Sequence, residues 1–287
     1  MPKLAYQVIT PERRRTAVVF ASPHSGRDYP WSFVRKSVLD TQMIRSSEDA
    51  FVDDLFEAAP SFGAPLLKAC APRAFIDYNR SADELDPALI DGMAKGKALN
   101  PRVASGLGVV PRVVAGGRAI YRGKMPMSEA QRRIETYWQP YHQKLQELLD
   151  ASHREFGMSI LVDCHSMPHE AVDSVARLGA KRPDVVLGDR FGAAADEEVV
   201  EQIERALVNA GLRVVRNTPF AGAYTAQHYG RPSRGQHAVQ IEIDRSIYMN
   251  EKMIRPNGNF KAFKALLEGV IADITRFGAR KIPLAAE

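Results

Sequence analysis

Short apolar segments alternate with longer amphipathic segments along this chain, and this alternation limits the folds that the chain can adopt. The apolar segments predict β-strands, and they cover residues 16–22, 64–71, 73–78, 158–166, 184–189, 212–217 and 237–244. The amphipathic segments predict helices over residues 47–59, 127–157, 194–211 and 259–278. Strands that alternate with helices favour an α/β fold. We therefore expect a three-layer sandwich around a mixed, mainly parallel sheet, built as one domain over residues 1–287.

Local signals mark the ends of the predicted helices. Ser47 is a suitable N-cap for the helix over 47–59, and Ser128 and Gln131 have the spacing of a capping box. Pro140 lies inside the longest helical pattern and should kink or split it. Gly211 should end the third helix. Residues 81–116 and 218–236 are rich in proline, glycine and polar residues, and we expect loops there.

The composition excludes several classes of protein. Of the 287 residues, 45% are hydrophobic and 25% are charged, which is typical of a globular protein and not of a disordered or fibrous one. No apolar run is long enough to cross a bilayer, and the first residues lack the apolar run of a secretory signal. We therefore expect a cytoplasmic protein without a membrane partner.

The charged residues argue against a nucleic-acid partner. Lys and Arg number 39 and Asp and Glu 34, so the net charge is +5, and the basic residues are scattered along the chain. Scattered charges favour a solvated surface over a nucleic-acid footprint, and the small excess also suits a site for small carboxylates. The two cysteines, Cys70 and Cys164, lie in or beside apolar runs, so we expect them to contribute to packing.

Three of the apolar segments end in ionisable residues, in the stretches AVVFASPHSG, SILVDCHS and HAVQIEID. Strand ends at one edge of an α/β sheet can meet in space, and ligands bind there. His24, His165 and an acid from the pair Glu48–Asp49 would supply two imidazoles and a carboxylate, the donor set of a catalytic zinc site. The alternative is that each of these residues is an ordinary cap, packing or turn residue. Pro23, Ser25 and Gly26 favour a turn and so also agree with this alternative.

Two more acids near these strand ends have candidate roles. Asp163 is either a turn residue or an acceptor that orients a ligand imidazole. In QIEID, the side chains of Gln240, Glu242 and Asp244 share one face of the strand, opposite Ile241 and Ile243. A desolvated Glu242 that faces a cleft would have a raised pKa and could act as a general base. The alternative is an edge strand with an ordinary hydrated face.

Other polar residues are candidates for substrate binding. The adjacent pair Asn79–Arg80 can hold a carboxylate, and RAFIDYNR also supplies Arg73 and Asp77. Arg122, next to Tyr121, is a less specific anion site. The polar loop before the last strand could close over a substrate through Tyr224, Thr225, His228, Tyr229 and Arg231. Each of these residues could equally be a cap, a turn former or part of a solvated loop tip.

The order of these motifs resembles the N-formylglutamate amidohydrolase family. The stretches that carry the resemblance are SPHSGRDYP, SEDAFVDDLF, FIDYNRSADELDP, AIYRG, LVDCHSMP and HAVQIEIDRSIYM, and they span about residues 18–250. The family is grouped with the zinc carboxypeptidases and the aspartoacylases. The resemblance therefore implies a phosphorylase/hydrolase-like α/β fold and the hydrolysis of an amide bond.

The resemblance also implies roles for single residues. His24 and His165 resemble the zinc histidines and Asp49 the acidic ligand, with Glu48 as its rival. Glu242 resembles the catalytic carboxylate, and Arg73 is similar to an arginine that polarises the scissile carbonyl. The residues implied in substrate binding are Asn79, Arg80, Arg122, Tyr224 and Thr225.

The expected activity is hydrolysis of a small N-acyl amino acid that depends on Zn²⁺ or another divalent metal. N-formyl-L-glutamate or a similar N-formyl amino acid is the favoured substrate, with release of formate as in histidine degradation. One alternative is a zinc peptidase or deacylase that removes another acyl group. The other is a non-catalytic carboxylate-binding protein on the same fold. The sequence does not define an oligomeric state.

Overall fold

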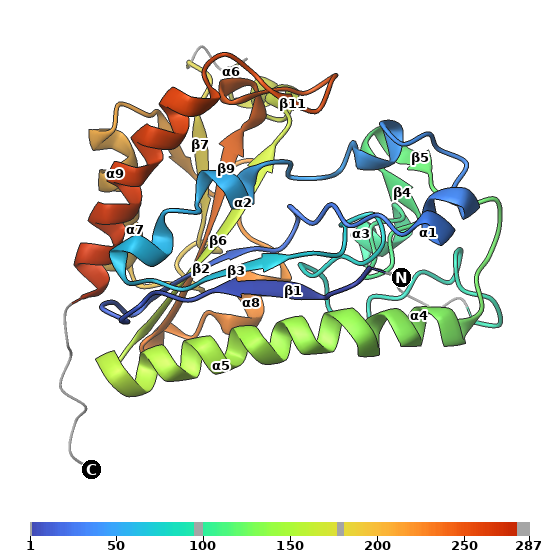
Figure 1. Cartoon of the computed structure of the whole chain (residues 1–287), viewed down its shortest axis with the longest axis horizontal. Coiled ribbons are helices and arrows are strands. Elements are labelled where there is room, and N and C mark those ends of the chain that lie inside the picture. The colour runs from blue at the N-terminus through green and yellow to red at the C-terminus, as the bar shows by residue number, and fades with distance from the viewer. Residues whose placement is uncertain (1, 95–99, 177–180, 280–287) are drawn as a thin grey trace. The chain divides into compact units, whose positions relative to one another are not determined.

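A seven-stranded sheet flanked by helices forms the centre of the fold in a computed structural model, which describes residues 2–94, 100–176 and 181–279 (Figure 1). The strand order is β1-β3-β2-β6-β9-β7-β8. The strands are β1 (Tyr6–Ile9), β2 (Val18–Ser22), β3 (Leu66–Ala69), β6 (Ser159–Met167), β7 (Val185–Gly188), β8 (Val214–Arg216) and β9 (Gln236–Asp244). The predicted α/β fold is therefore confirmed.

The sheet is mixed, and three neighbouring strands in it run the same way. β2 pairs with β6 and β6 with β9 in parallel, β7 pairs with β8 in parallel, and β7 pairs with β9 antiparallel. Ala21 is the register partner of Asp163, and His165 is the register partner of Glu242. Because β2, β6 and β9 are parallel, their carboxyl ends lie at one edge of the sheet, which is the edge where the sequence places its ionisable residues.

The chain divides into two compact units. The first comprises residues 1–7, 23–50 and 68–144, and the second comprises residues 8–22, 51–67 and 145–287. The prediction of a single domain over residues 1–287 stays a prediction.

The core of the second unit contains the buried strands β2 and β6. Every residue of β2 and β6 is buried, as expected for apolar strands that are covered on both faces. Helix α9 (Phe260–Gly278) contacts β2, α2 (Val52–Leu55) and α7 (Glu197–Asn209), and α8 (Tyr224–Tyr229) packs on β6 and β9.

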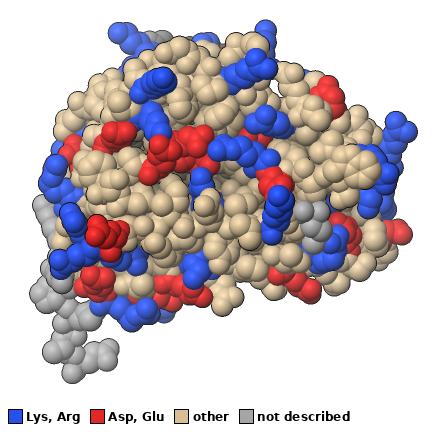
Figure 2. Space-filling model, viewed as in Figure 1, with Lys and Arg blue, Asp and Glu red and all other residues tan. Residues whose placement is uncertain are grey.

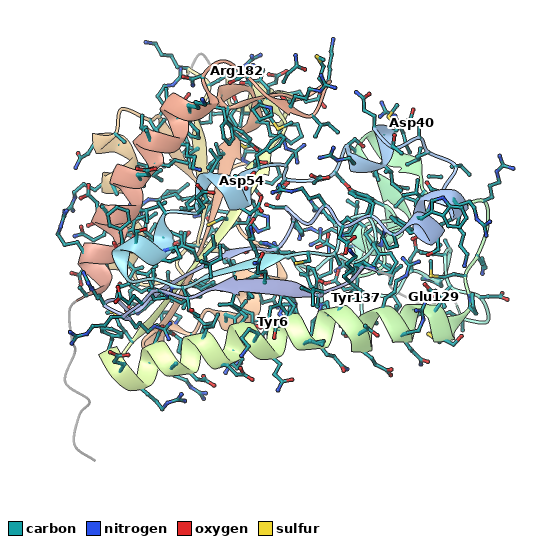
Figure 3. The ribbon with its side chains drawn as sticks, in the orientation of Figure 1. Tyr6, Asp40, Asp54, Glu129, Tyr137 and Arg182 are labelled. Carbon is teal, nitrogen blue, oxygen red and sulfur yellow. The ribbon has the colours of Figure 1, made fainter. Side chains whose placement is uncertain are left out.

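The first unit is held by aromatic contacts. Tyr78 stacks on Tyr141 with ring centroids 4.3 Å apart, and Tyr6 meets Tyr141 edge-on (Figure 3 labels Tyr6). The buried guanidinium of Arg133 lies 4.0 Å from the centroid of the Phe75 ring. Such pairs add favourable electrostatics to the burial of aromatic surface.

The longest helical pattern forms one continuous run of three segments. They are α4 (Met127–Arg133), a π-helical turn over Ile134–Trp138, and α5 (Gln139–Phe156). Pro140 has no amide hydrogen for the regular helical bond, and the wider turn directly before it is where the helix accommodates this loss. Pro126 is the N-cap of α4 and no side chain caps this end, so the predicted capping box is wrong.

Several other local expectations are wrong. Residues 73–78 form turns instead of a strand, and the helix expected over 47–59 is reduced to α2, whose N-cap is Phe51 instead of Ser47. The loop over 218–236 contains α8. Besides short 3₁₀ turns, the described residues also form α1 (Trp31–Lys36), α3 (Pro101–Ala104), β4 (Val113–Val114), β5 (Arg118–Ala119), α6 (Asp173–Ala176), β10 (Met249–Asn250) and β11 (Arg255–Pro256).

On the face seen in Figure 2, acidic and basic side chains are interspersed, as the scattered charges of the sequence predict. Within residues 2–94, 100–176 and 181–279, no helix combines the length and the apolar composition that a membrane span requires.

Candidate metal centre and active site

The segment that follows β2 is fixed by close backbone contacts. Asp49 donates its backbone N–H to the carbonyl oxygen of His24 (3.0 Å), and the Ser25 hydroxyl donates to the carbonyl oxygen of Asp49 (3.0 Å). A Cβ atom on Gly26 would lie 2.1 Å from the carbonyl oxygen of Ala71. The glycine is therefore required because two backbone segments meet there.

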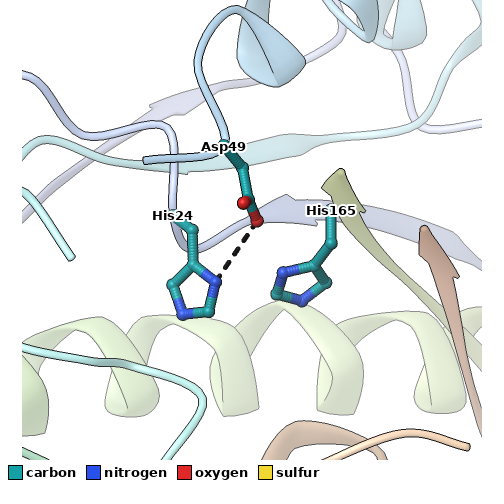
Figure 4. A group of neighbouring side chains, drawn as sticks. All are labelled: His24, Asp49 and His165. Carbon is teal, nitrogen blue, oxygen red and sulfur yellow. Dashed lines mark ion pairs between the residues drawn. The ribbon is translucent and has the colours of Figure 1, made fainter. Parts of the chain in front are cut away.

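The His24 ring lies between two buried carboxylates. Its Nδ1 is 3.3 Å from Oδ2 of Asp49, and its Nε2 is 2.7 Å from Oδ1 of Asp77 (Figure 4 shows His24 and Asp49). When Nε2 carries the hydrogen and donates it to Asp77, Nδ1 presents a lone pair toward Asp49. Asp77 thus selects the tautomer in which Nδ1 can bind a metal.

Asp77 is held in its charged form. Arg73 Nε donates to its Oδ2 (3.1 Å), and the backbone N–H of Asn79 donates to its Oδ1 (2.8 Å). Burial acts to raise the pKa of Asp77, but its contact with the His24 ring and the charges of Arg73 and Arg80 outweigh burial and keep this pKa well below its ordinary value. The sequence pattern assigns no role to Asp77. Its position two residues before the Asn79–Arg80 pair is the signal that could have drawn attention to it.

Arg73 also approaches the second carboxylate. Its Nη1 is 4.0 Å from Oδ1 of Asp49, so this guanidinium lies beside both Asp49 and Asp77. The predicted role of Arg73 in polarising a carbonyl stays a prediction.

The neighbouring acid, Glu48, is engaged elsewhere. Arg45 donates to its two carboxylate oxygens from Nε and Nη2, both at 2.9 Å, and the Tyr29 hydroxyl donates to it at 3.2 Å. Burial, together with the nearby charge of Glu48, raises the pKa of Tyr29 well above its ordinary value. Of the two acids that the sequence left open, Asp49 is therefore the one placed beside His24.

The polar residues at the ends of β6 and β9 share one face of the sheet. Asp163 pairs in register with Gln240, and His165 with Glu242. His165 Nε2 is 3.0 Å from Oδ2 of Asp163, but the contact lacks hydrogen-bond geometry. Within the described part of the chain, neither carboxylate oxygen of the fully buried Asp163 has a hydrogen-bond partner. Asp163 therefore lies beside the His165 ring, and its role in orienting a ligand imidazole stays a prediction.

Glu242 is nearly buried, with 9% of its surface exposed. Gln240 Nε2 donates a hydrogen bond to its Oε1 (2.8 Å). Ile241 and Ile243 are fully buried, as the alternation along the strand predicts.

Burial raises the pKa of the Cys164 thiol well above its ordinary value, which disfavours a thiolate and agrees with a packing role.

His24, Asp49 and His165 form a buried group that could bind a metal (Figure 4). One ligand atom from each of the three residues lies within 4.8 Å of the other two. Two imidazole nitrogens and one carboxylate oxygen match the donor set of catalytic zinc sites, which keep a further position for water or substrate. The residues present therefore fit a divalent metal.

The predicted carboxylate anchor lies in a buried turn. Arg80 is 6% exposed, and it donates from Nε to the carbonyl oxygen of Leu107 (2.9 Å) and from Nη1 to that of Asn79 (3.1 Å). Burial lowers the pKa of Arg80. Trp138 Nε1 donates to the carbonyl oxygen of Arg80 (2.9 Å), which ties this turn to the long helix. Substrate binding by Asn79 and Arg80 stays a prediction.

The other predicted substrate residues lie in two places. Arg122 is exposed, just beyond β5. Tyr224 and Thr225 begin α8, which packs on the two strands that carry His165 and Glu242. Thr225 is buried, and Tyr224 stacks on His228 with ring centroids 5.0 Å apart.

The chain is also similar to known proteins of one family. The family model described as N-formylglutamate amidohydrolase matches residues 16–249. The chain is 29% identical over 253 residues to the N-formylglutamate deformylase of Pseudomonas aeruginosa, covering 86% of this chain and 87% of that protein. It is also 29% identical over 252 residues to the deformylase of Pseudomonas putida, covering 85% of this chain and 86% of that protein.

A solved structure supports the same conclusion. The N-formylglutamate amidohydrolase of Ralstonia eutropha JMP134 superposes with a TM-score of 0.88 at 34% identity, covering 96% of this chain and 99% of that one. Since the family model spans most of the sequence and the relatives align over nearly their whole length, this chain belongs to the N-formylglutamate amidohydrolase family.

Proposed function

We propose that this amidohydrolase removes the formyl group from N-formyl-L-glutamate, or a similar N-formyl amino acid, and that it depends on Zn²⁺ or another divalent metal. The observation that carries the proposal is the buried group of His24, Asp49 and His165, together with the pairing of His165 and Glu242 on neighbouring strands. The named activity of the relatives supports the choice of acyl group and amino acid.

In this proposal a metal would be held by His24 Nδ1, His165 and Asp49. When bound, such a metal supplies Lewis acidity, which polarises the amide carbonyl and lowers the pKa of water. Asp77 keeps the His24 ring in the required tautomer, and the carboxylate of Asp163 lies beside the ring of His165.

Glu242 moves the proton. It accepts a proton from water as the water oxygen attacks the formyl carbon, and it gives that proton to the amide nitrogen as the C–N bond breaks. The products are formate and the free amino acid. Glu242 is nearly buried and lies in register with His165 on the neighbouring strand.

The remaining predicted residues would position the substrate. The guanidinium of Arg80, with Asn79, binds the carboxylate of the amino acid, and Arg73 stabilises the charge that develops on the carbonyl oxygen. Arg122, Tyr224 and Thr225 contribute further contacts. A cytoplasmic location and a place in histidine degradation remain expectations from the sequence.

Replacing His165 with alanine tests the metal and the chemistry together. We expect the purified wild-type protein to contain one metal ion per chain and to release formate from N-formyl-L-glutamate. The variant His165→Ala should lose both properties because one of three metal ligands is gone. His153→Ala is the matched control, since His153 lies in α5 and its Nε2 is hydrogen-bonded to the carbonyl oxygen of Arg234. Full metal content in His165→Ala would contradict the proposal.

A substrate panel separates the proposal from its alternatives. Release of formate from N-formyl amino acids, with slower release of larger acids from N-acetyl or N-succinyl analogues, supports a deformylase. A preference for a larger acyl group supports another deacylase. Binding of the carboxylate ligand without metal and without turnover supports a non-catalytic binding protein.

A further inference from the structure

Gln240 is a buried polar residue on the same face of β9 as Glu242, and the mechanism above does not use it. It is 3% exposed, and its Nε2 donates to Oε1 of Glu242 at 2.8 Å. The two residues are separated by one position along the strand, so their side chains project from the same side of the sheet. The uncharged carboxamide of Gln240 thus lies beside Glu242, the acid proposed to transfer the proton.

The surroundings make this hydrogen bond important for the orientation of the carboxylate. Glu242 has three rotatable side-chain bonds, and an unrestrained carboxylate would sample several rotamers. A hydrogen bond to a charged acceptor is shorter and stronger than one between neutral groups, and it gains strength where water is excluded. Gln240 itself is carried by the buried strand β9, whose register against β6 is fixed over nine pairs from Ser159–Gln236 to Met167–Asp244.

We propose that Gln240 is a positioning residue that holds Oε1 of Glu242, so that Oε2 is the oxygen that accepts and returns the proton. This inference rests on the proposed function, because it requires Glu242 to be the base. The carboxamide suits the task because it donates to either protonation state of Glu242 and does not take up a proton itself. When Oε2 is protonated, Oε1 still accepts the bond from Gln240, so the orientation of the carboxyl group persists through the reaction.

The test is the variant Gln240→Met, which keeps the length of the side chain and removes the donor. We expect kcat on N-formyl-L-glutamate to fall about 10- to 100-fold, the range for a misplaced catalytic group, with little change in KM. The control is Gln146→Met. Gln146 donates a part-buried hydrogen bond to Asp150 (2.7 Å) on α5, and its replacement should leave kcat unchanged.

A double-mutant cycle separates positioning from a general structural effect. In a Glu242→Gln background, Gln240→Met should cause no further loss of kcat, because the group that it positions is no longer a base. Metal content and thermal unfolding are measured for every variant. Should Gln240→Met not fold, Gln240→Asn replaces it, since the shorter amide is withdrawn from Glu242 by one methylene and should also lower kcat.

Two results would overturn the inference alone: wild-type kcat in Gln240→Met, or equal losses in both backgrounds of the cycle. Failure of the proposed function looks different. If the wild type releases no formate, or if Glu242→Gln keeps full turnover, then Glu242 is not the base and both proposals fall.

Discussion

Replacing Asp77 with asparagine should weaken metal binding although Asp77 is not a metal ligand. The carboxylate accepts hydrogen bonds on both oxygens, from His24 Nε2 and the Asn79 amide on Oδ1 and from Arg73 on Oδ2. Asparagine has the same shape but only one acceptor oxygen. One of the two sides must therefore face an NH₂ group that donates toward another donor.

Either orientation of the new side chain is unfavourable. If its oxygen faces His24, the amide nitrogen faces the Nε of Arg73 and an uncompensated donor is buried. If the amide nitrogen faces His24 instead, the imidazole must accept at Nε2. The hydrogen then moves to Nδ1, the nitrogen that should bind the metal.

The expected loss follows from these contacts. Replacing partners that orient metal-binding imidazoles costs about 10- to 100-fold in metal affinity, which corresponds to about 1.4–2.8 kcal/mol. We expect Asp77→Asn to raise the Kd for Zn²⁺ within that range, measured by competition with a chelating dye at fixed pH. The rate of formate release at saturating metal reports separately on whether the loaded site still works.

The control is a second buried aspartate of the same unit. Asp86 accepts from Arg112 Nε (2.7 Å) and from the backbone N–H of Ala88 (2.8 Å), so Asp86→Asn should lower stability without changing the Kd for Zn²⁺. A wild-type Kd in Asp77→Asn would refute the reasoning about the His24 tautomer. Equal losses of affinity in both variants would show that the effect is general destabilisation.

Two further predictions concern stability. Gly26→Ala should lower the free energy of unfolding in urea by about 1–3 kcal/mol or more, because the new Cβ would overlap the backbone of Ala71. The control is Gly258→Ala, which has open space around it and should change the free energy of unfolding by less than about 0.5 kcal/mol. Equal effects of the two variants would contradict the close contact at Gly26. Burial lowers the pKa of His237, although the charge of Asp196 opposes this shift, and His237 Nδ1 accepts a hydrogen bond from the backbone N–H of Asp196 (3.3 Å). The folded protein therefore favours the neutral ring. The contribution of His237 to the free energy of unfolding should be full above the unfolded pKa of about 6.5 and be lost as the pH falls through the lower folded pKa. His237→Gln should therefore show a smaller loss of unfolding free energy between neutral and acidic pH than the wild type, and an unchanged pH dependence would contradict this assignment.

The strongest parts of the fold could be predicted from the sequence because hydrophobic periodicity and burial agree there. The segments 16–22, 158–166 and 237–244 are apolar, buried and strand-forming, and they became β2, β6 and β9. Because parallel strands end at a common edge, His165 and Glu242 could be expected together from the pattern alone.

The errors arise where contacts distant in sequence override local preference. Residues 73–78 are aromatic and β-branched enough to suggest a strand, yet the turn lets Asp77 reach His24 and brings Phe75 against Arg133. Ser47 has a side chain suited to an N-cap, but α2 begins only after Phe51. The backbone N–H of Asp49 is hydrogen-bonded to the carbonyl oxygen of His24, and this contact keeps Asp49 beside His24. Propensity cannot indicate either outcome, because both depend on partners far along the chain.

The alternation along β9 has a consequence for how errors in folding affect activity. The two isoleucines that fill the core and the acid proposed to transfer protons occupy successive positions on opposite faces of the strand. A shift of this strand by a single residue would turn the isoleucines toward the polar face and press Glu242 into the hydrocarbon interior. A molecule with this strand in the wrong register would therefore lose both stability and activity. Molecules that remain folded would have the register that activity requires.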